Sequence, residues 1–221
     1  MTSMEKMAQI GLAALQDGGA DQAVCSVSRS VVRELTAEWG EFSLYRTIFD
    51  DSVGFMATIG GRRGVLSQNA GNEEAIRNGA ANCLKSAKAA DPDEAWQLAP
   101  PLPEQLFETG PLACDEEKLF VRCEEFLADI RTRFPLISIS SLVATHVLRE
   151  GVSLYSTGSR FFSRRGVYSV DLMFNATEEE ATSSFFATSV EMLDLDTPFM
   201  ELGSFESDLA AISRQIFTKA M

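Results

Sequence analysis

The chain has 221 residues, 45% of them hydrophobic and 23% charged, and its formal net charge at pH 7 is −13. This composition is typical of a folded protein and allows one large domain or two small ones. Nucleic acids and anionic membranes are bound through clustered lysines and arginines, so the acidic balance argues against both as direct partners. No apolar run reaches transmembrane length, and we expect no signal peptide, which together predict a cytoplasmic protein.

Side chains that commonly carry chemistry are few. The four cysteines form no C-x-x-C pair, and His146 is the only histidine. This pattern indicates neither a zinc site nor a preformed Cys-His dyad, so we assign no catalytic, cofactor-binding or metal-ligating residue. One alternative stays open, a thiol hydrolase in which Cys114 or Cys123 acts with His146 if the fold brings them together.

The first 90 residues have the pattern helix, four strands, helix. A capping box at Thr2–Glu5 begins the first helix and Gly18-Gly19 ends it. We expect a turn at Asp50-Asp51, a two-residue hairpin loop at Gly60-Gly61 and a second helix capped by Asn72. The expected strands, rich in β-branched and aromatic residues, are Val24–Leu35, Glu41–Phe49, Ser52–Ile59 and Arg62–Gln68.

The second half repeats this order after a distinct segment. Residues 91–114 hold five of the seven prolines, which predicts a semi-rigid linker. A helix capped by Asp115 follows, and turns are expected at Glu150-Gly151 and Glu178–Glu180. A last helix, capped by Ser204, extends to Lys219. The extended segments expected between them are Leu136–Arg149, Val152–Ser156, Ser159–Phe162, Val167–Phe174 and Ala181–Val190.

These elements predict an α+β fold made of two repeated α-β-β-β-β-α units, residues 1–90 and 115–221. Four antiparallel strands leave one apolar face open, and the flanking amphipathic helices cover it. We therefore expect a mainly antiparallel sheet covered by helices, with the two units packed together.

Two motifs have both a functional and a structural interpretation. The run Gly60–Gly64 (GGRRG) could cradle a phosphate, but it lies between two strands and lacks the phosphate-loop spacing, which favours a hairpin turn. Arg160, Arg164 and Arg165, with the phenylalanines between them, could bind an acidic peptide through bidentate arginine contacts. A solvated turn with two core aromatics is the structural alternative, and we favour it.

Several segments, taken in order, resemble the TldD/PmbA family, whose members are described as modulators of DNA gyrase and as zinc metallopeptidases. The resemblance is carried by SVSRS (Ser26–Ser30), IGGRRGVLSQN (Ile59–Asn69), the helix and linker of Glu73–Ala99, and YSTGS (Tyr155–Ser159). It covers nearly the whole chain from about Gln9 onward and is closer to the PmbA, or TldE-like, branch. The resemblance implies the N-terminal domain of such a protein, ending where the family's β-rich C-terminal domain begins.

The resemblance transfers no catalytic residue, because the histidine-glutamate metal motif of TldD-type members is missing from this chain. It implies a scaffolding and dimerisation role in a system that processes peptides. Zinc is expected only in the C-terminal domain or in a TldD-type partner. The implied partners are a second copy or a TldD-like subunit, with extended peptides as substrates. A stand-alone module that binds a peptide or protein without catalysis is the alternative from another class.

Overall fold

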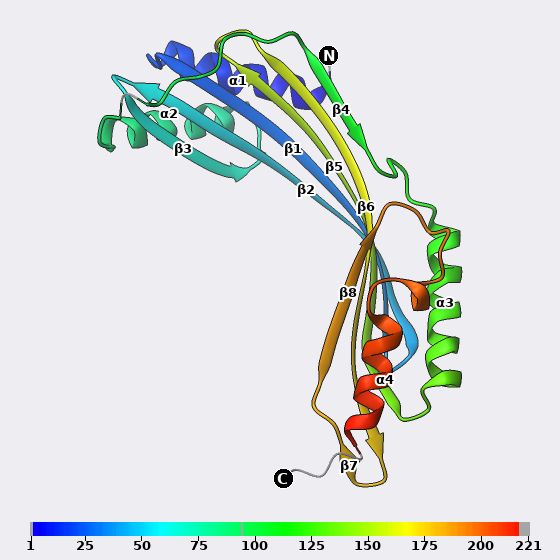
Figure 1. Cartoon of the computed structure of the whole chain (residues 1–221). Helices are drawn as coiled ribbons and strands as arrows, with labels where there is room; N and C mark the ends of the chain where they lie inside the picture. Colours follow the sequence, from blue (N-terminus) through cyan, green and yellow to red (C-terminus); the bar gives the residue numbers. More distant parts are fainter. Residues whose placement is uncertain (1, 94, 217–221) are drawn as a thin grey trace. The chain divides into compact units, whose positions relative to one another are not determined.

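The computed structural model describes residues 2–93 and 95–216 (Figure 1). The helices are α1 (Ser3–Asp17), α2 (Glu73–Ala89), α3 (Glu116–Arg133) and α4 (Phe205–Gln215), with a short 3-10 helix η1 (Phe199–Glu201). The strands are β1 (Gln22–Glu38), β2 (Glu41–Ile59), β3 (Arg62–Asn69), β4 (Gln105–Thr109), β5 (Ile137–Tyr155), β6 (Arg160–Glu178), β7 (Ala181–Thr182) and β8 (Phe186–Met192). The expected α+β class is confirmed.

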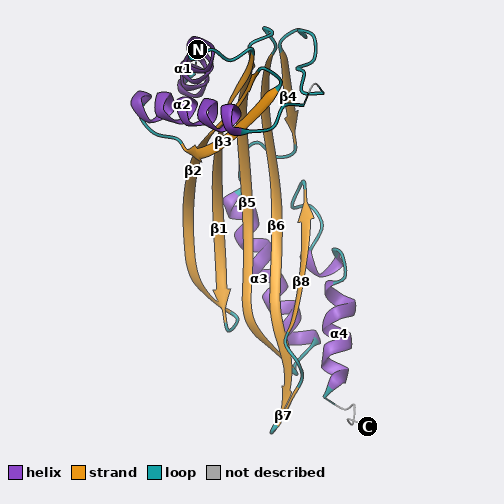
Figure 2. Ribbon diagram, turned by 90° about the vertical axis from the view of Figure 1, so that its left-hand side faces the viewer, coloured by secondary structure: helices purple, strands orange, loops and turns teal. Residues whose placement is uncertain are grey.

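The strands form one sheet in the order β3-β2-β1-β5-β6-β4, with β7 and β8 also paired to β6. β2 and β3 pair antiparallel from Ser52↔Asn69 to Ile59↔Arg62, and β8 pairs antiparallel with β6. β4 is the exception, since it runs parallel to β6. The sheet is thus mainly antiparallel, as the sequence predicts, and Figure 2 shows its long strands face-on.

The chain's contacts divide it into two compact units. Unit 1 contains residues 1–31, 49–109 and 149–165, and unit 2 contains residues 32–48, 110–148 and 166–221. Both units draw residues from before and after the segment 91–114, because β1, β2, β5 and β6 each contribute to both. Each unit has a hydrophobic core of its own.

In unit 1, α1 and α2 cover one face of the sheet. The capping box of α1 is present, with Thr2 Oγ1 accepting a hydrogen bond from the backbone N–H of Glu5, 3.2 Å away. Asn72 caps α2 in the same way through Ala75 N–H. The core packs both helices against alternate strand residues and includes Ala8, Leu15, Cys25, Val27, Val53, Phe55, Ile76, Ala80, Cys83 and Leu154.

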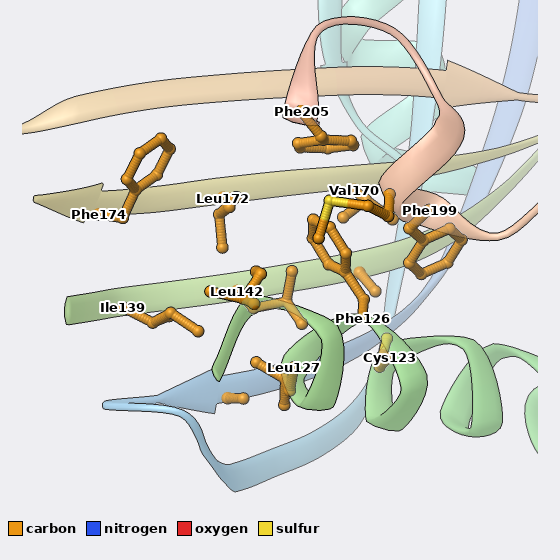
Figure 3. Packing of buried hydrophobic residues seen from close by; sticks show 14 of the residues in the cluster. Cys123, Phe126, Leu127, Ile139, Leu142, Val170, Leu172, Phe174, Phe199 and Phe205 are labelled. Carbon is orange, nitrogen blue, oxygen red and sulfur yellow. The ribbon is translucent and has the colours of Figure 1, made fainter. Parts of the chain in front are cut away.

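In unit 2, α3, η1 and α4 pack on the sheet around a cluster rich in phenylalanine (Figure 3). Phe126 of α3 lies at its centre, with ring centroids 4.9 Å from Phe205 and 6.0 Å from Phe199. Asp115 caps α3 by accepting from Lys118 N–H. Ser204 precedes α4 but gives no such cap; its hydroxyl donates to the carboxylate of Asp208 instead. α4 is described to Gln215, and the expected end at Lys219 lies outside the described residues.

The turns expected at Asp50-Asp51 and Glu150-Gly151 are wrong, since both lie inside continuous 19-residue strands, β2 and β5. Charged residues do not end these strands because their carboxylates have partners: Arg29 binds Asp51, and Arg164 binds Glu150. Gly151 does not turn the chain either. A Cβ at that position would lie 2.7 Å from Ser163 Oγ, so the glycine makes room for the neighbouring strand.

Three other expectations about extended segments need revision. The segments Ser159–Phe162 and Val167–Phe174 lie, apart from Ser159, in one strand, β6, without a turn at Gly166. The proline-rich segment 91–114 is not only a spacer, because it contains β4. The expected strand Ala181–Val190 is divided into β7 and β8. The turn at Glu178–Glu180 is confirmed, with Glu179 at φ 55°, as is the Gly60-Gly61 hairpin, whose two glycines have φ of 55° and 71°.

Candidate functional site

The thiols of Cys114 and Cys123 lie in surroundings that suppress their reactivity. Cys123 is fully buried in the core of unit 2, and burial raises the pKa of its thiol to about 12. Cys114 is partly buried beside Tyr168, and burial raises its thiol pKa to about 11. A nucleophilic cysteine needs a lowered pKa, because the thiolate is the reacting form. The environments of both sulfurs oppose the thiol-hydrolase alternative.

His146 is held as a neutral, structural imidazole. It is fully buried in β5, its ring centroid is 4.8 Å from that of Tyr168, and its Nε2 lies 2.8 Å from the carbonyl oxygen of Pro111. Because a carbonyl can only accept, Nε2 carries the proton and donates, which leaves Nδ1 bare. Nδ1 has no hydrogen-bond partner within the described part of the chain. Protonating Nδ1 would therefore place an unpaired charge in the core, and burial lowers the pKa of His146 from its usual 6.5.

We expect this histidine to make the protein less stable as the pH falls below about 6.5. The unfolded chain binds a proton near that pH, whereas the folded chain binds it only at the lower pKa, so stability is complete above 6.5 and declines below it. One such proton changes the free energy of unfolding by at most about 1.4 kcal/mol per pH unit. Urea unfolding at pH 7.5, 6.5 and 5.5 measures the slope.

The chain's single histidine makes this test specific, because it is the only side chain whose ordinary pKa lies in that window. His146→Gln keeps a side-chain amide that can donate to the Pro111 carbonyl but does not titrate. We expect this variant to lose the pH slope between 7.5 and 5.5. An equal slope in both proteins, or an imidazole pKa at or above 6.5 by NMR, would contradict the interpretation.

Two of the three arginines in the basic-aromatic patch of β6 are paired with neighbouring carboxylates. Arg160 binds the carboxylates of Glu5 and Glu104, and Arg164 binds those of Glu108 and Glu150. Phe161 packs edge-on against Tyr155, with ring centroids 5.4 Å apart, and Phe162 packs against the core of unit 1. These contacts favour the structural interpretation of the patch over an open site for acidic peptides.

A row of alternating charges crosses five strands of unit 1. In strand order β2-β1-β5-β6-β4, it consists of Asp51, Arg29, Glu150, Arg164 and Glu108. The guanidinium of the first arginine binds both oxygens of the aspartate, at 2.8 and 2.7 Å, and this bidentate pair holds the pKa of the carboxyl below its usual range. The second arginine contacts both glutamates at 3.0 Å. The sequence gives no sign of this row, because each residue comes from a different strand.

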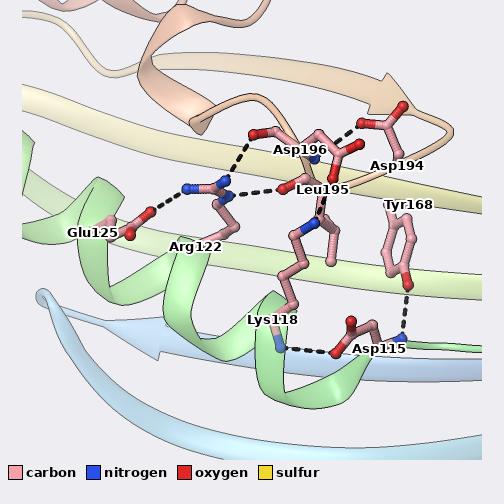
Figure 4. Close-up of polar contacts among 8 residues, drawn as sticks. All are labelled: Asp115, Lys118, Arg122, Glu125, Tyr168, Asp194, Leu195 and Asp196. Carbon is pink, nitrogen blue, oxygen red and sulfur yellow. Dashed lines mark hydrogen bonds and ion pairs between the residues drawn. The ribbon is translucent and has the colours of Figure 1, made fainter.

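The start of α3 is tied to the loop after β8 by polar contacts (Figure 4). Arg122 donates to the carbonyl oxygens of Leu195 and Asp196, at 2.8 and 2.7 Å, and Lys118 pairs with the Asp196 carboxylate. Tyr168 Oη accepts from the backbone N–H of Asp115 at 2.8 Å. These contacts fix the ends of two elements and bring no set of catalytic groups together.

The described residues do not fit a zinc ion. Across residues 2–93 and 95–216, no group of three or more histidine, cysteine, aspartate or glutamate side chains is placed to hold a metal. The one imidazole is committed to the Pro111 carbonyl. We therefore derive no metal-dependent chemistry from this chain.

Each unit has a groove on its surface. The groove in unit 1 has a volume of about 480 Å³ and lies beside the start of α1, with Arg29, Glu150 and Arg164 in its lining. The groove in unit 2 has a volume of about 500 Å³ and lies between β2 and α3, with a mostly apolar lining. Sequence reasoning missed both, because each is assembled from segments far apart in the chain. Among the described helices, none is both long and apolar enough to cross a bilayer.

Comparison with known proteins gives structural likeness alone. No protein-family model matches the chain, and no curated protein matches it. Its fold is similar to that of TldE from Thermococcus kodakarensis, with a TM-score of 0.70, 17% identity, and coverage of 98% of this chain and 47% of that one. It is similar to a protein of Bacteroides thetaiotaomicron described as a candidate modulator of DNA gyrase, at TM-score 0.73, 16% identity and coverage of 98% and 51%.

A third solved structure, from Thermotoga maritima MSB8 and also described as a candidate modulator of a DNA gyrase, has a TM-score of 0.68 and 12% identity, with coverage of 99% and 50%. The chain thus spans about half the length of the solved structures that it matches. The expected likeness to TldE and to the candidate DNA gyrase modulators is confirmed at the level of the fold.

Proposed function

We propose that this chain forms the N-terminal, non-catalytic half of a TldE-like protein that works in a peptide-processing system. The observation that carries the proposal is the match of 98–99% of the chain to about half of each similar structure. The chemistry of the described residues supports it, since the thiols have raised pKa values and the only histidine is buried and hydrogen-bonded. The role of this half is to enclose part of the chamber that admits extended peptides and to support dimerisation.

The proposal assigns zinc to residues outside this chain, in a C-terminal domain or in a TldD-type partner. A site enclosed by protein admits a flexible extended peptide and excludes folded proteins, so access rather than side-chain pockets selects the substrate. The partner in this scheme is a second copy or a TldD-like subunit, in the cytoplasm. The net charge of −13 supports a role without direct DNA contact.

For the isolated chain, we expect no stoichiometric zinc and no peptidase activity. Elemental analysis after incubation with zinc and dialysis measures the first, and hydrolysis of an unfolded peptide measures the second. The matched experiment uses the full-length gene product, with and without a TldD-type partner, where we expect hydrolysis only with the partner. One zinc per isolated chain would overturn the proposal, as would hydrolysis that depends on this chain alone.

The second candidate is a stand-alone binding module without catalysis. The apolar groove of unit 2 favours this candidate, because an apolar groove can bind a partner without any catalytic residues. The gene distinguishes the two candidates: an open reading frame that continues past residue 221 into a domain with a metal motif supports the first. Absence of hydrolysis by the full-length protein with its partner supports the second.

A further inference from the structure

The first part of β2, Glu41–Ile48, is an unpaired edge of the sheet in unit 2. β2 lies outermost beside β1, and β3 pairs with β2 only from Ser52 to Ile59. Within the described part of the chain, no strand pairs with Glu41–Ile48 on its outer side, as Figure 2 shows. Backbone N–H and C=O groups of this segment therefore face outward without a partner strand. Another extended chain could form hydrogen bonds with them.

This edge has few of the features that usually protect an exposed strand. It contains no proline or lysine, and its two charged residues are paired, Glu41 with Arg131 and Arg46 with Glu34. Its apolar side chains are accessible: Leu44 is 42% exposed, Tyr45 49% and Ile48 38%. An exposed apolar edge of this length is a liability unless another chain covers it.

A groove runs alongside the same edge. Its walls are Phe42–Tyr45 of β2 and the first turns of α3, and its volume is about 500 Å³. Phe42 and Phe120 stack across it with ring centroids 4.6 Å apart, and Phe120 remains 39% exposed. An edge strand beside an apolar groove under a helix offers both main-chain hydrogen bonds and a place for alternate side chains.

The end of the groove at the start of α3 is acidic. Glu116 and Glu117 line it in the first turn of the helix. Glu116 is shared by Arg33, 2.6 Å away, and the hydroxyl of Tyr45. Glu117 has no ion pair with any residue that the structure describes. A bound chain with a lysine or arginine at this end gains a favourable contact, whereas an acidic chain is repelled.

From these observations we propose that an extended polypeptide segment of another protein adds to Glu41–Ile48 as a further strand. Its alternate apolar side chains enter the groove beside Phe120, and a lysine or arginine lies beside Glu117. Charge complementarity selects this occupant over a second copy of the chain. A second copy would bring a net charge of −13 to a groove whose end is lined by the acidic Glu117, which opposes self-association at this surface.

The inference names a ligand-binding surface for the peptide-handling role proposed above but does not depend on hydrolysis. The test is fluorescence anisotropy of the full chain with a labelled peptide of alternating valine and threonine that ends in arginine. We expect saturable binding, weakened about tenfold or more when alternate amides of the peptide are N-methylated, because those amides no longer donate. Phe120→Asp and Glu117→Lys are expected to weaken binding of the unmodified peptide by a similar factor.

Val121→Asp is the matched control, since Val121 is 42% exposed on the same helix but does not line the groove. We expect it to bind the peptide like the unaltered chain, and circular dichroism verifies that each variant is folded. Equal binding of the N-methylated and unmodified peptides would overturn the proposal, as would no saturable binding of either. A dimer of the unaltered chain that Phe120→Asp dissociates would also overturn it, in favour of self-association. Peptide hydrolysis by the full-length protein is a separate measurement, so the two proposals can fail independently.

Discussion

Replacing Phe126 with alanine is expected to lower the free energy of unfolding by about 4 kcal/mol, within the range measured for large buried aromatics. The side chain is 1% exposed, and its ring contacts both Phe199 of η1 and Phe205 of α4. Truncation therefore leaves a cavity where three helical elements meet. The surrounding side chains are themselves held by neighbours on the sheet, so the cavity cannot close without cost.

The control for this prediction is Val121→Ala on the outer face of the same helix. Val121 is 42% exposed, and such surface substitutions change stability by about 0.5 kcal/mol or less. Urea unfolding followed by circular dichroism measures both variants. A cost below about 1 kcal/mol for Phe126→Ala would contradict the packing of α3 on η1 and α4 shown in Figure 3.

Local signals in the sequence were sufficient for most of the helices. The capping box at Thr2–Glu5 and the caps at Asn72 and Asp115 are all present, because a side-chain oxygen three residues before a free N–H is a local arrangement. The apolar stripes of α1, α2 and α3 also lie in the cores as expected. Only the cap at Ser204 is wrong, since its hydroxyl contacts a carboxylate rather than the backbone.

Strand lengths could not be read from local signals. Asp51 and Glu150 look like turn residues, yet each is held inside a long strand by an arginine that comes from another strand. Local sequence patterns do not indicate which arginine will lie beside which carboxylate. Strand register is set by pairing between segments that are far apart in the sequence. For the same reason, neither the charge row nor the groove beside β2 could be predicted.

Residue types alone do not determine the reactivity of Cys114, Cys123 and His146. The candidate groups were named from the sequence, but their reactivity depends on burial and partners that only the fold supplies. In the fold, His146 donates a hydrogen bond to the Pro111 carbonyl, and Cys123 is buried in a phenylalanine-rich core. Burial and hydrogen-bond partners of this kind cannot be read from simple periodic patterns in the sequence.

Gly64→Ala is expected to lower the free energy of unfolding by about 3 kcal/mol, the upper part of the usual range for overpacking. Gly64 is the last glycine of the GGRRG run and lies in β3 directly beneath α2. A Cβ at this position would lie 2.3 Å from the carbonyl oxygen of Cys83 and 2.5 Å from the backbone nitrogen of Ala87. Both atoms belong to the helix backbone, which cannot rotate away as a side chain could, so α2 must shift off the sheet.

The comparison with Gly60→Ala isolates this effect. Gly60 lies in the hairpin at φ 55°, and a Cβ there meets no atom within 4 Å, so we expect only the strain of a left-handed residue, about 1 kcal/mol. Two glycines of the run thus serve the turn, while the third permits the close approach of a helix. Equal costs for the two substitutions in urea unfolding would show that α2 does not contact β3 at Gly64. A larger cost at Gly64 supports the close packing, because the two variants add the same methyl group.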